Sequence, residues 1–186
     1  MGHIAKFTRR KFMQMAVVGS AAGSIISCIG TSNPWRHLSE DEARTLEAIC
    51  DRIIPADQDP GARWAGVVNF IDKQLLGPYR KLQKTYHLGL AATNETSQAM
   101  FGKRITALSG VQADEVLHKI EKGQAPGDTW KQVSPKEFMS MVVAHTMQGF
   151  YGDPRHGGNR ERVSWKMVRL PFPPVRGRLQ YDLTKS

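Results

Sequence analysis

The side chains that most often carry out chemistry in proteins are few in this sequence and lie far apart. Six histidines are spread over 186 residues, and no two of them have the short spacing typical of a metal-binding helix or finger. Only the fold could bring His87, His118 and His145 together as ligands. A lone histidine on a helix is more often hydrogen-bonded within the protein, so we expect no metal site in this chain.

Sequence motifs for cofactor chemistry are absent as well. The sequence contains no GxGxxG dinucleotide fingerprint, no Walker loop, no HExxH zinc motif and no GxSxG nucleophile elbow. Its two cysteines, Cys28 and Cys50, are too few for a CxxCH haem site, an iron–sulfur cluster or a cysteine zinc site. We therefore expect the chain to have no catalytic, cofactor-binding or metal-binding residues of its own.

The densest group of unusual residues is a glycine-rich segment, Gly149-Phe-Tyr-Gly-Asp-Pro-Arg-His-Gly-Gly-Asn-Arg160, with Trp165 shortly after it. Its four glycines indicate unusual dihedral angles or a close approach of backbones. One interpretation is a helix C-cap followed by a turn that folds Trp165 onto the core. The other is a rigid loop that presents side chains to a partner, since aromatic residues and arginine are common interface anchors. The candidate partner-binding residues are Tyr151, Asp153, His156, Gly157, Gly158, Asn159, Arg160 and Trp165.

The N-terminal segment has the pattern of an export signal. Thr8-Arg9-Arg10-Lys11-Phe12 precedes a short apolar run that is too short and too rich in Gly and Ser for a good membrane span. Arg9, Arg10 and Phe12 resemble the twin-arginine signal, which directs folded proteins to the periplasm. The alternatives are an uncleaved amphipathic anchor or a chance arginine pair.

Cys28 closes this segment in Ile25-Ile26-Ser27-Cys28, which resembles a lipobox. Its thiol is the nucleophile that would carry a diacylglycerol, and the lipid would tether the domain to a membrane. The alternative is ordinary cleavage near residues 21–23, with Cys28 an incidental small residue. Cys50 lies on the apolar face of a predicted helix and is expected to be a small buried residue.

The net charge of +9 lies at the two ends of the chain. Four basic residues and no acidic residue precede Cys28, and from Arg160 onward seven basic residues face two acidic ones. The body between residues 28 and 159 is neutral, with 15 residues of each sign. A nucleic-acid-binding protein usually carries its charge on a folded face, so we expect no nucleic-acid partner.

The remaining chain reads as one helical domain. Capping boxes at Ser39-x-x-Glu42 and Ser134-Pro-x-Glu137 mark two helix starts. Apolar residues at helical spacing predict helices at about 39–54, at 64–76, from Tyr79 through Leu90, from Phe101 through Leu108, from Val116 through Ile120, and from Pro135 to just before Gly149. No stretch alternates in the manner of strands.

These patterns predict an all-α protein, an irregular bundle of five to six helices with long loops and an extended C-terminal tail. The expected layout is a signal segment at 1–28, a linker at 29–37, a helical domain at 38–170 and a tail rich in proline and arginine at 171–186. Three prolines in Leu170-Pro-Phe-Pro-Pro-Val175 prevent that stretch from being helical throughout.

Two sets of motifs carry a family resemblance. The first is Leu38-Ser-x-x-Glu42, Leu46-x-Ala-Ile-Cys-Asp51-x-Ile-Ile-Pro55, Pro60-Gly-Ala62, Ala65-Gly-Val67 and Phe70-Ile-Asp72. The second is Gly149-Phe-Tyr-Gly-Asp-Pro154, Gly157-Gly-Asn159 and Trp165-Lys166. Over about 38–170 the chain thereby resembles the gluconate 2-dehydrogenase subunit 3 family. The sequence Arg169-Leu-Pro171 departs from the family pattern, which has a small or aromatic residue such as Gly or Tyr before the proline.

The resemblance implies a function as a non-catalytic accessory subunit. Its partner would be a large FAD-dependent dehydrogenase that oxidises gluconate, a sugar or a polyol, often with a multihaem cytochrome c as a third subunit. The chain would support the folding, twin-arginine co-export and assembly of the flavoprotein. It would be held at the membrane by a lipid anchor or by its partners. Folded export of a chain without a cofactor makes sense if a cofactor-loaded partner travels with it. The alternative is a transient export chaperone that takes no part in the mature complex.

Overall fold

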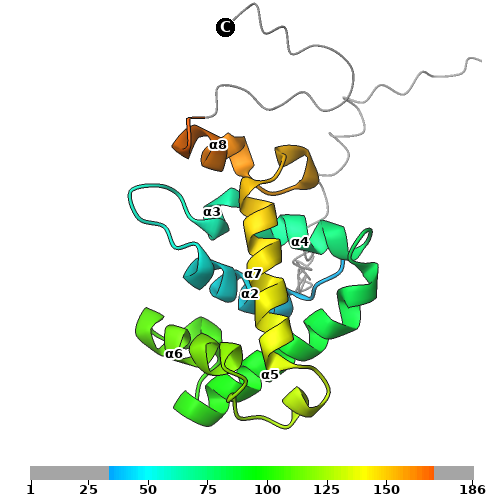
Figure 1. Cartoon of the computed structure of the whole chain (residues 1–186), viewed down its shortest axis with the longest axis vertical. Helices are drawn as coiled ribbons and strands as arrows, with labels where there is room; N and C mark the ends of the chain where they lie inside the picture. The colour runs from blue at the N-terminus through cyan, green and yellow to red at the C-terminus, as the bar shows by residue number, and fades with distance from the viewer. Residues whose placement is uncertain (1–33, 170–186) are drawn as a thin grey trace, which may run out of the picture. The chain divides into compact units, whose positions relative to one another are not determined.

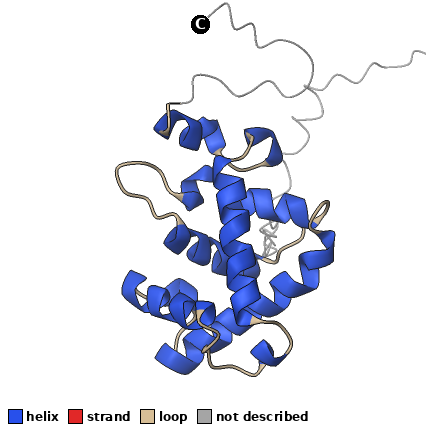
Figure 2. Ribbon diagram, viewed as in Figure 1, coloured by secondary structure: helices blue, strands red, loops and turns tan. Residues whose placement is uncertain are grey.

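The computed structural model of the protein describes residues 34–169, and every regular element among them is helical (Figures 1 and 2). The prediction of an all-α fold is confirmed. The α-helices are α2 (Glu40–Ile53), α3 (Ala62–Ala65), α4 (Val67–Leu75), α5 (Gln83–Phe101), α6 (Gly110–Glu121), α7 (Pro135–Tyr151) and α8 (Val163–Met167). Short 3-10 turns occur at Arg80–Leu82, Ile105–Ala107, Thr129–Lys131, Pro154–His156 and Arg160–Arg162. Within 34–169, no helix is both long and apolar enough to cross a membrane.

Serine side chains fix the starts of three helices. At α2 the Ser39 hydroxyl accepts from the Glu42 amide, and Glu42 accepts from the Ser39 amide, so the predicted capping box is confirmed. At α7 the structure shows one of the two expected bonds, from the Glu137 amide to the Ser134 hydroxyl. A further complete box between Ser109 and Gln112 opens α6, which sequence reasoning did not identify.

Helices α2 and α7 form the centre of the domain. Each contacts α3, α4, α5 and α6, and α7 crosses in front of α2 in Figure 1. The apolar stripe that predicted α2 turns inward, with Leu46, Ile49 and Cys50 completely buried. The largest fully buried side chains are Tyr86, Phe138, Phe150, Leu38, Leu46, Ile49, Ile71, Leu75, Leu90, Ile105, Ile120 and Val67. Burial of this set from every long helix gives the domain one continuous core.

Helix α5 reaches α7 through a glycine. A Cβ atom on Gly89 would lie 2.1 Å from Cδ2 of Phe138, so the Phe138 ring occupies the space that a side chain would take. The same ring packs against Tyr86 and Trp130. A glycine inside a helix costs about 1 kcal/mol relative to alanine. At Gly89 the close ring packing offsets that cost.

The structure extends two predicted helices, since α5 runs to Phe101 and α6 begins at Gly110. Two others are divided or replaced. The segment 64–76 is divided at Gly66, whose φ of 73° is left-handed, into α3 and α4. The separate helix expected from Phe101 to Leu108 is wrong, because Phe101 is the last residue of the 19-residue α5. Gly102, with φ of 66°, ends that helix, and Ile105 lies in a 3-10 turn. Both differences follow from left-handed glycines, which end a helix without a proline.

A buried carboxylate holds the beginning of the domain. Asp72 of α4 is 3% exposed and accepts from the backbone amides of Arg36, His37 and Leu38 at 2.8 to 2.9 Å. These three donors neutralise much of the cost of burying a charge. Asp72 therefore connects the segment before α2 to the middle of α4.

Candidate partner-binding site

The glycine-rich segment starts as helix and not as loop. Helix α7 was expected to end before Gly149, yet it continues through Tyr151. Gly149 is buried, and a Cβ atom there would lie 3.0 Å from the Phe70 ring and 3.2 Å from Val67. Gly149 therefore lets the end of α7 lie directly on α4.

The next glycines bring the turn back onto these two helices. A Cβ atom on Gly158 would lie 2.1 Å from the carbonyl oxygen of Gly149. At Gly157, where φ is 106°, a Cβ atom would lie 2.8 Å from the Lys73 side chain. Any side chain at Gly158 would collide with backbone. The pair Gly157 and Gly158 thus packs the turn tightly against α7 and α4.

Asn159 fixes the turn from inside. It is completely buried and adopts the left-handed conformation, with φ of 45°. Its amide nitrogen donates to the Gly152 carbonyl at 2.8 Å, and its Oδ1 accepts from the Ser164 amide at 3.0 Å. The Trp165 indole N–H donates to the Tyr151 carbonyl at 2.9 Å. Asn159 and Trp165 therefore join the end of α7 to α8 through contacts within the chain.

Asp153 closes the other half of the turn. It accepts from the Arg155 amide at 3.0 Å and from the Arg155 guanidinium at 3.0 and 2.7 Å. These hydrogen bonds hold the pKa of the Asp153 carboxyl at about 2, so the carboxyl is charged at any physiological pH. Asp153 is thereby engaged in shaping the turn.

The side chains that remain at the surface form the candidate binding site. Tyr151 is 44% exposed, and His156 and Arg160 are exposed as well. The guanidinium carbon of Arg160 lies 5.8 Å from the ring centre of Trp64, which belongs to α3 and is 38% exposed. Sequence reasoning missed Trp64, because only the packing of α3 near the turn at Arg160–Arg162 brings it there. We define the apical surface as Trp64, His156 and Arg160.

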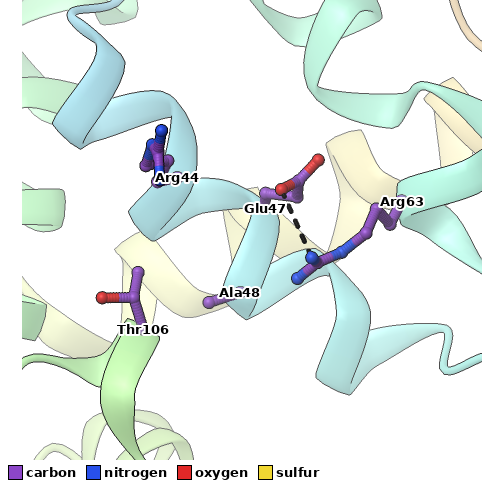
Figure 3. A pocket seen from close by; sticks show the side chains of 5 residues that line it. All are labelled: Arg44, Glu47, Ala48, Arg63 and Thr106. Carbon is purple, nitrogen blue, oxygen red and sulfur yellow. Dashed lines mark ion pairs between the residues drawn. The ribbon is translucent and has the colours of Figure 1, made fainter.

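A second candidate site is a hollow of about 290 Å³ beside α2 and α3 (Figure 3). Its lining residues are Arg44, Glu47, Ala48, Arg63 and Thr106. Arg63 pairs with Glu47 at 3.7 Å and with Asp51 at 2.6 Å, and Arg44 pairs with Glu40. Both guanidinium groups are already paired within the domain. The hollow is therefore better explained as a surface of ion pairs than as a ligand site.

The three histidines considered as metal ligands have separate environments. His87 contacts Glu42, and its ring lies 4.9 Å from the ring of His37. His118 lies 3.5 Å from Glu121. His145 is buried in the core, where its Nδ1 shares a 2.8 Å hydrogen bond with Tyr86. In the described part of the chain, no three His, Cys, Asp or Glu residues are placed to hold a metal ion together.

Cys50 is inaccessible in the core. Its exposed fraction is zero, and its sulfur lies 3.3 Å from the Thr146 hydroxyl. Burial raises the pKa of the Cys50 thiol to about 12, because a thiolate there would have little solvation. The prediction of a small buried residue is confirmed. Cys28, like Arg9, Arg10 and Phe12, lies outside the described residues.

These features define an all-helical protein whose candidate site is an exposed aromatic and basic surface supported by a rigid turn. Trp, Tyr and Arg are the residues that most often anchor protein interfaces. The family model described as Gluconate 2-dehydrogenase subunit 3 matches residues 40–171, and the chain belongs to this family. No curated protein and no solved structure matches the chain.

Proposed function

We propose that this chain is the non-catalytic accessory subunit of a periplasmic FAD-dependent dehydrogenase that oxidises gluconate, another sugar acid, a sugar or a polyol. Family membership implies a multi-subunit dehydrogenase with a larger catalytic subunit. The FAD belongs to that subunit, and a multihaem cytochrome c as third subunit would take up its electrons. This chain supports the folding, export and assembly of the flavoprotein.

The apical surface is the observation that carries the proposal. Trp64 and Arg160 come from distant parts of the sequence and meet at 5.8 Å with both side chains exposed. The turn beneath them is fixed by the buried Asn159 and by the contact of Gly158 with Gly149. A rigid support reduces the entropy lost on binding, which favours a lasting interface. We propose that this surface contacts the flavoprotein.

The test is the affinity of the flavoprotein for a variant with His156→Ala and Arg160→Ala. Both side chains are exposed, so their truncation should change the free energy of unfolding by less than about 0.5 kcal/mol. The dissociation constant should rise at least about tenfold, the equivalent of about 1.4 kcal/mol. Titration of purified flavoprotein and a thermal melt of each variant give the two quantities.

Arg44→Ala is the matched control, because Arg44 is an exposed arginine of α2 with 66% of its side chain accessible. Its truncation removes the same charge from another part of the surface and should leave the affinity unchanged. Equal affinity for wild type, the double variant and the control would refute the apical surface as the interface. An equal loss of affinity in the double variant and in Arg44→Ala would show an effect of net charge alone.

We further propose that the N-terminal signal exports the complex and that a lipid on Cys28 holds it at the membrane. The thiol of Cys28 is the group that would carry the lipid, so Cys28→Ala should release the mature protein from membranes without unfolding it. A mature wild-type N-terminus other than a modified Cys28 would rule out the anchor.

The alternative, a transient export chaperone, makes a different prediction about the mature enzyme. An accessory subunit should purify with the active periplasmic flavoprotein in a constant ratio. A chaperone should be present during export and absent from the active enzyme. Quantitative mass spectrometry of the purified dehydrogenase separates the two.

A further inference from the structure

Helix α7 has an outer face without charge. Val143, Met147 and Tyr151 are 36%, 42% and 44% exposed and follow one another at four-residue spacing, so they form one apolar row, which we name the α7 stripe. The exposed residues beside it, Ser140, Ala144 and Gln148, are uncharged too. Such a row on a solvent-facing helix is unusual and indicates a surface that another segment covers.

Helices α2 and α6 contrast with α7. Ion pairs join Arg44 to Glu40 along α2, Arg52 of α2 to Asp114 of α6, and His118 to Glu121 along α6. These faces are suited to water. The absence of charge from Ser140 to Tyr151 therefore distinguishes α7 from α2 and α6.

Helix α8, the last helix of the described structure, lies at one end of the α7 stripe. Helix α8 packs on α7, and the Trp165 indole bonds to the carbonyl of Tyr151, the last residue of the stripe. The described chain stops at Arg169, four residues after Trp165. The sequence that follows, Leu170-Pro-Phe-Pro-Pro-Val175, contains no charged residue and three prolines.

The length of this sequence matches the stripe. Tyr151 and Val143 are eight residues apart, which is about 12 Å along a helix. Six residues in a polyproline II conformation extend about 19 Å, which is longer than the stripe. Proline restricts the free chain beforehand, so binding costs less entropy, and aromatic-lined surfaces are the usual sites for such segments.

Beyond Val143 the surface carries paired charges. Val143 lines a hollow of about 280 Å³ in which Arg52 pairs with Asp114 and His118 lies 3.5 Å from Glu121. The apolar α7 stripe is therefore bounded by charged residues at this end, as the apolar segment of the tail is bounded by Arg176.

We propose that residues 170–175 bind back along α7, with the apolar side chains of Leu170–Val175 over the α7 stripe. The tail is the occupant that the structure favours, because it follows directly on α8, which packs on α7, and this tether gives it an effective concentration in the millimolar range. This contact is independent of the apical surface and of the dehydrogenase partner.

The test uses the full mature chain and trypsin, which cuts after Arg176 and Arg178. Met147→Lys places a charge in the middle of the α7 stripe, and cleavage at these two sites should become at least about tenfold faster. Val111→Lys is the matched control, since Val111 is an apolar residue of α6 that is 80% exposed, and it should leave the cleavage rate unchanged. Equal rates in wild type and both variants overturn the proposal.

Disulfide trapping supplies a second measurement, made in the Cys28→Ala background. A Phe172→Cys, Met147→Cys pair should form an intramolecular disulfide at least about tenfold faster than a Phe172→Cys, Val111→Cys pair. Equal rates for the two pairs contradict the proposal. Disulfide-linked dimers in place of the intramolecular bond also overturn it, and identify a second copy of the chain as the occupant.

Discussion

The backbone of Gly158 lies directly against the carbonyl group of Gly149, so that a Cβ atom on Gly158 would lie 2.1 Å from that oxygen. Because the obstacle is backbone, no side-chain rotation relieves the contact. Gly158→Ala should therefore lower the free energy of unfolding by about 2 kcal/mol. Gly77→Ala is the control, since a Cβ atom there meets nothing closer than 3.9 Å. Urea unfolding of both variants measures the difference, and equal stability would show that the turn can move aside.

Asp72 should determine how firmly the segment before α2 is held. Asp72→Ala leaves the amides of Arg36, His37 and Leu38 without their acceptor, and should cost about 3 kcal/mol of unfolding free energy. Trypsin should also cut after Arg36 much faster in this variant. Asp128→Ala, at a carboxylate that is 87% exposed, should change neither quantity. An unchanged cleavage rate after Arg36 in Asp72→Ala would show that Asp72 does not hold this segment.

His145 should make stability fall in mildly acidic solution. Burial lowers the pKa of His145 below its usual value near 6.5. Below about pH 6.5 the unfolded chain then binds a proton that the folded chain does not, so the unfolding free energy decreases as the pH falls. The decrease attributable to one such group is at most about 1.4 kcal/mol for each pH unit.

The measurement is urea unfolding of wild type and His145→Gln at pH 7.5 and at pH 5.5. The variant should lose less stability between the two values than wild type. His118→Gln, at a histidine whose side chain is 58% exposed, should keep the wild-type difference. If the unfolding free energies of wild type and His145→Gln depend on pH in the same way, another group causes the dependence.

Export should depend on the arginine pair for two proteins at once. If the flavoprotein travels with this chain, Arg9→Lys with Arg10→Lys should keep both in the cytoplasm, because the twin-arginine carrier recognises the pair. Lys11→Arg keeps the charge and should leave export intact. Fractionation and immunoblotting of both proteins decide the question. A periplasmic flavoprotein in the double variant would show that it has its own route.

Much of the helical framework was predictable because local signals determine it. Ser39 and Ser134 located two helix starts, and the buried stripe of α2 was read directly from Leu46, Ile49 and Cys50. The division at Gly66 was missed, since a glycine within an apolar pattern can continue a helix or end it. Only its left-handed φ, which depends on the packing of α3 and α4, decides between the two.

The candidate site was predictable in its location and less so in its roles. The spacing of glycines located the turn, but burial of Asn159 and exposure of Arg160 depend on which side of the turn faces α7. Trp64 lies far away in sequence and carries no local sign of its contact with Arg160. Such a pair arises only when the helices pack.

The two close glycine contacts differ in whether a second mutation can repair a first. At Gly89 the neighbour is the Phe138 ring, so a smaller residue at 138 could make room for a side chain at 89, and a suppressor of Gly89→Ala should be recoverable by selection. At Gly158 the neighbour is the carbonyl of Gly149, which every amino acid has and which is already attached to the smallest residue. No substitution at 149 can enlarge that space. A genetic screen for suppressors should therefore return compensating changes at 138 for the α5–α7 contact, and only true revertants for the turn.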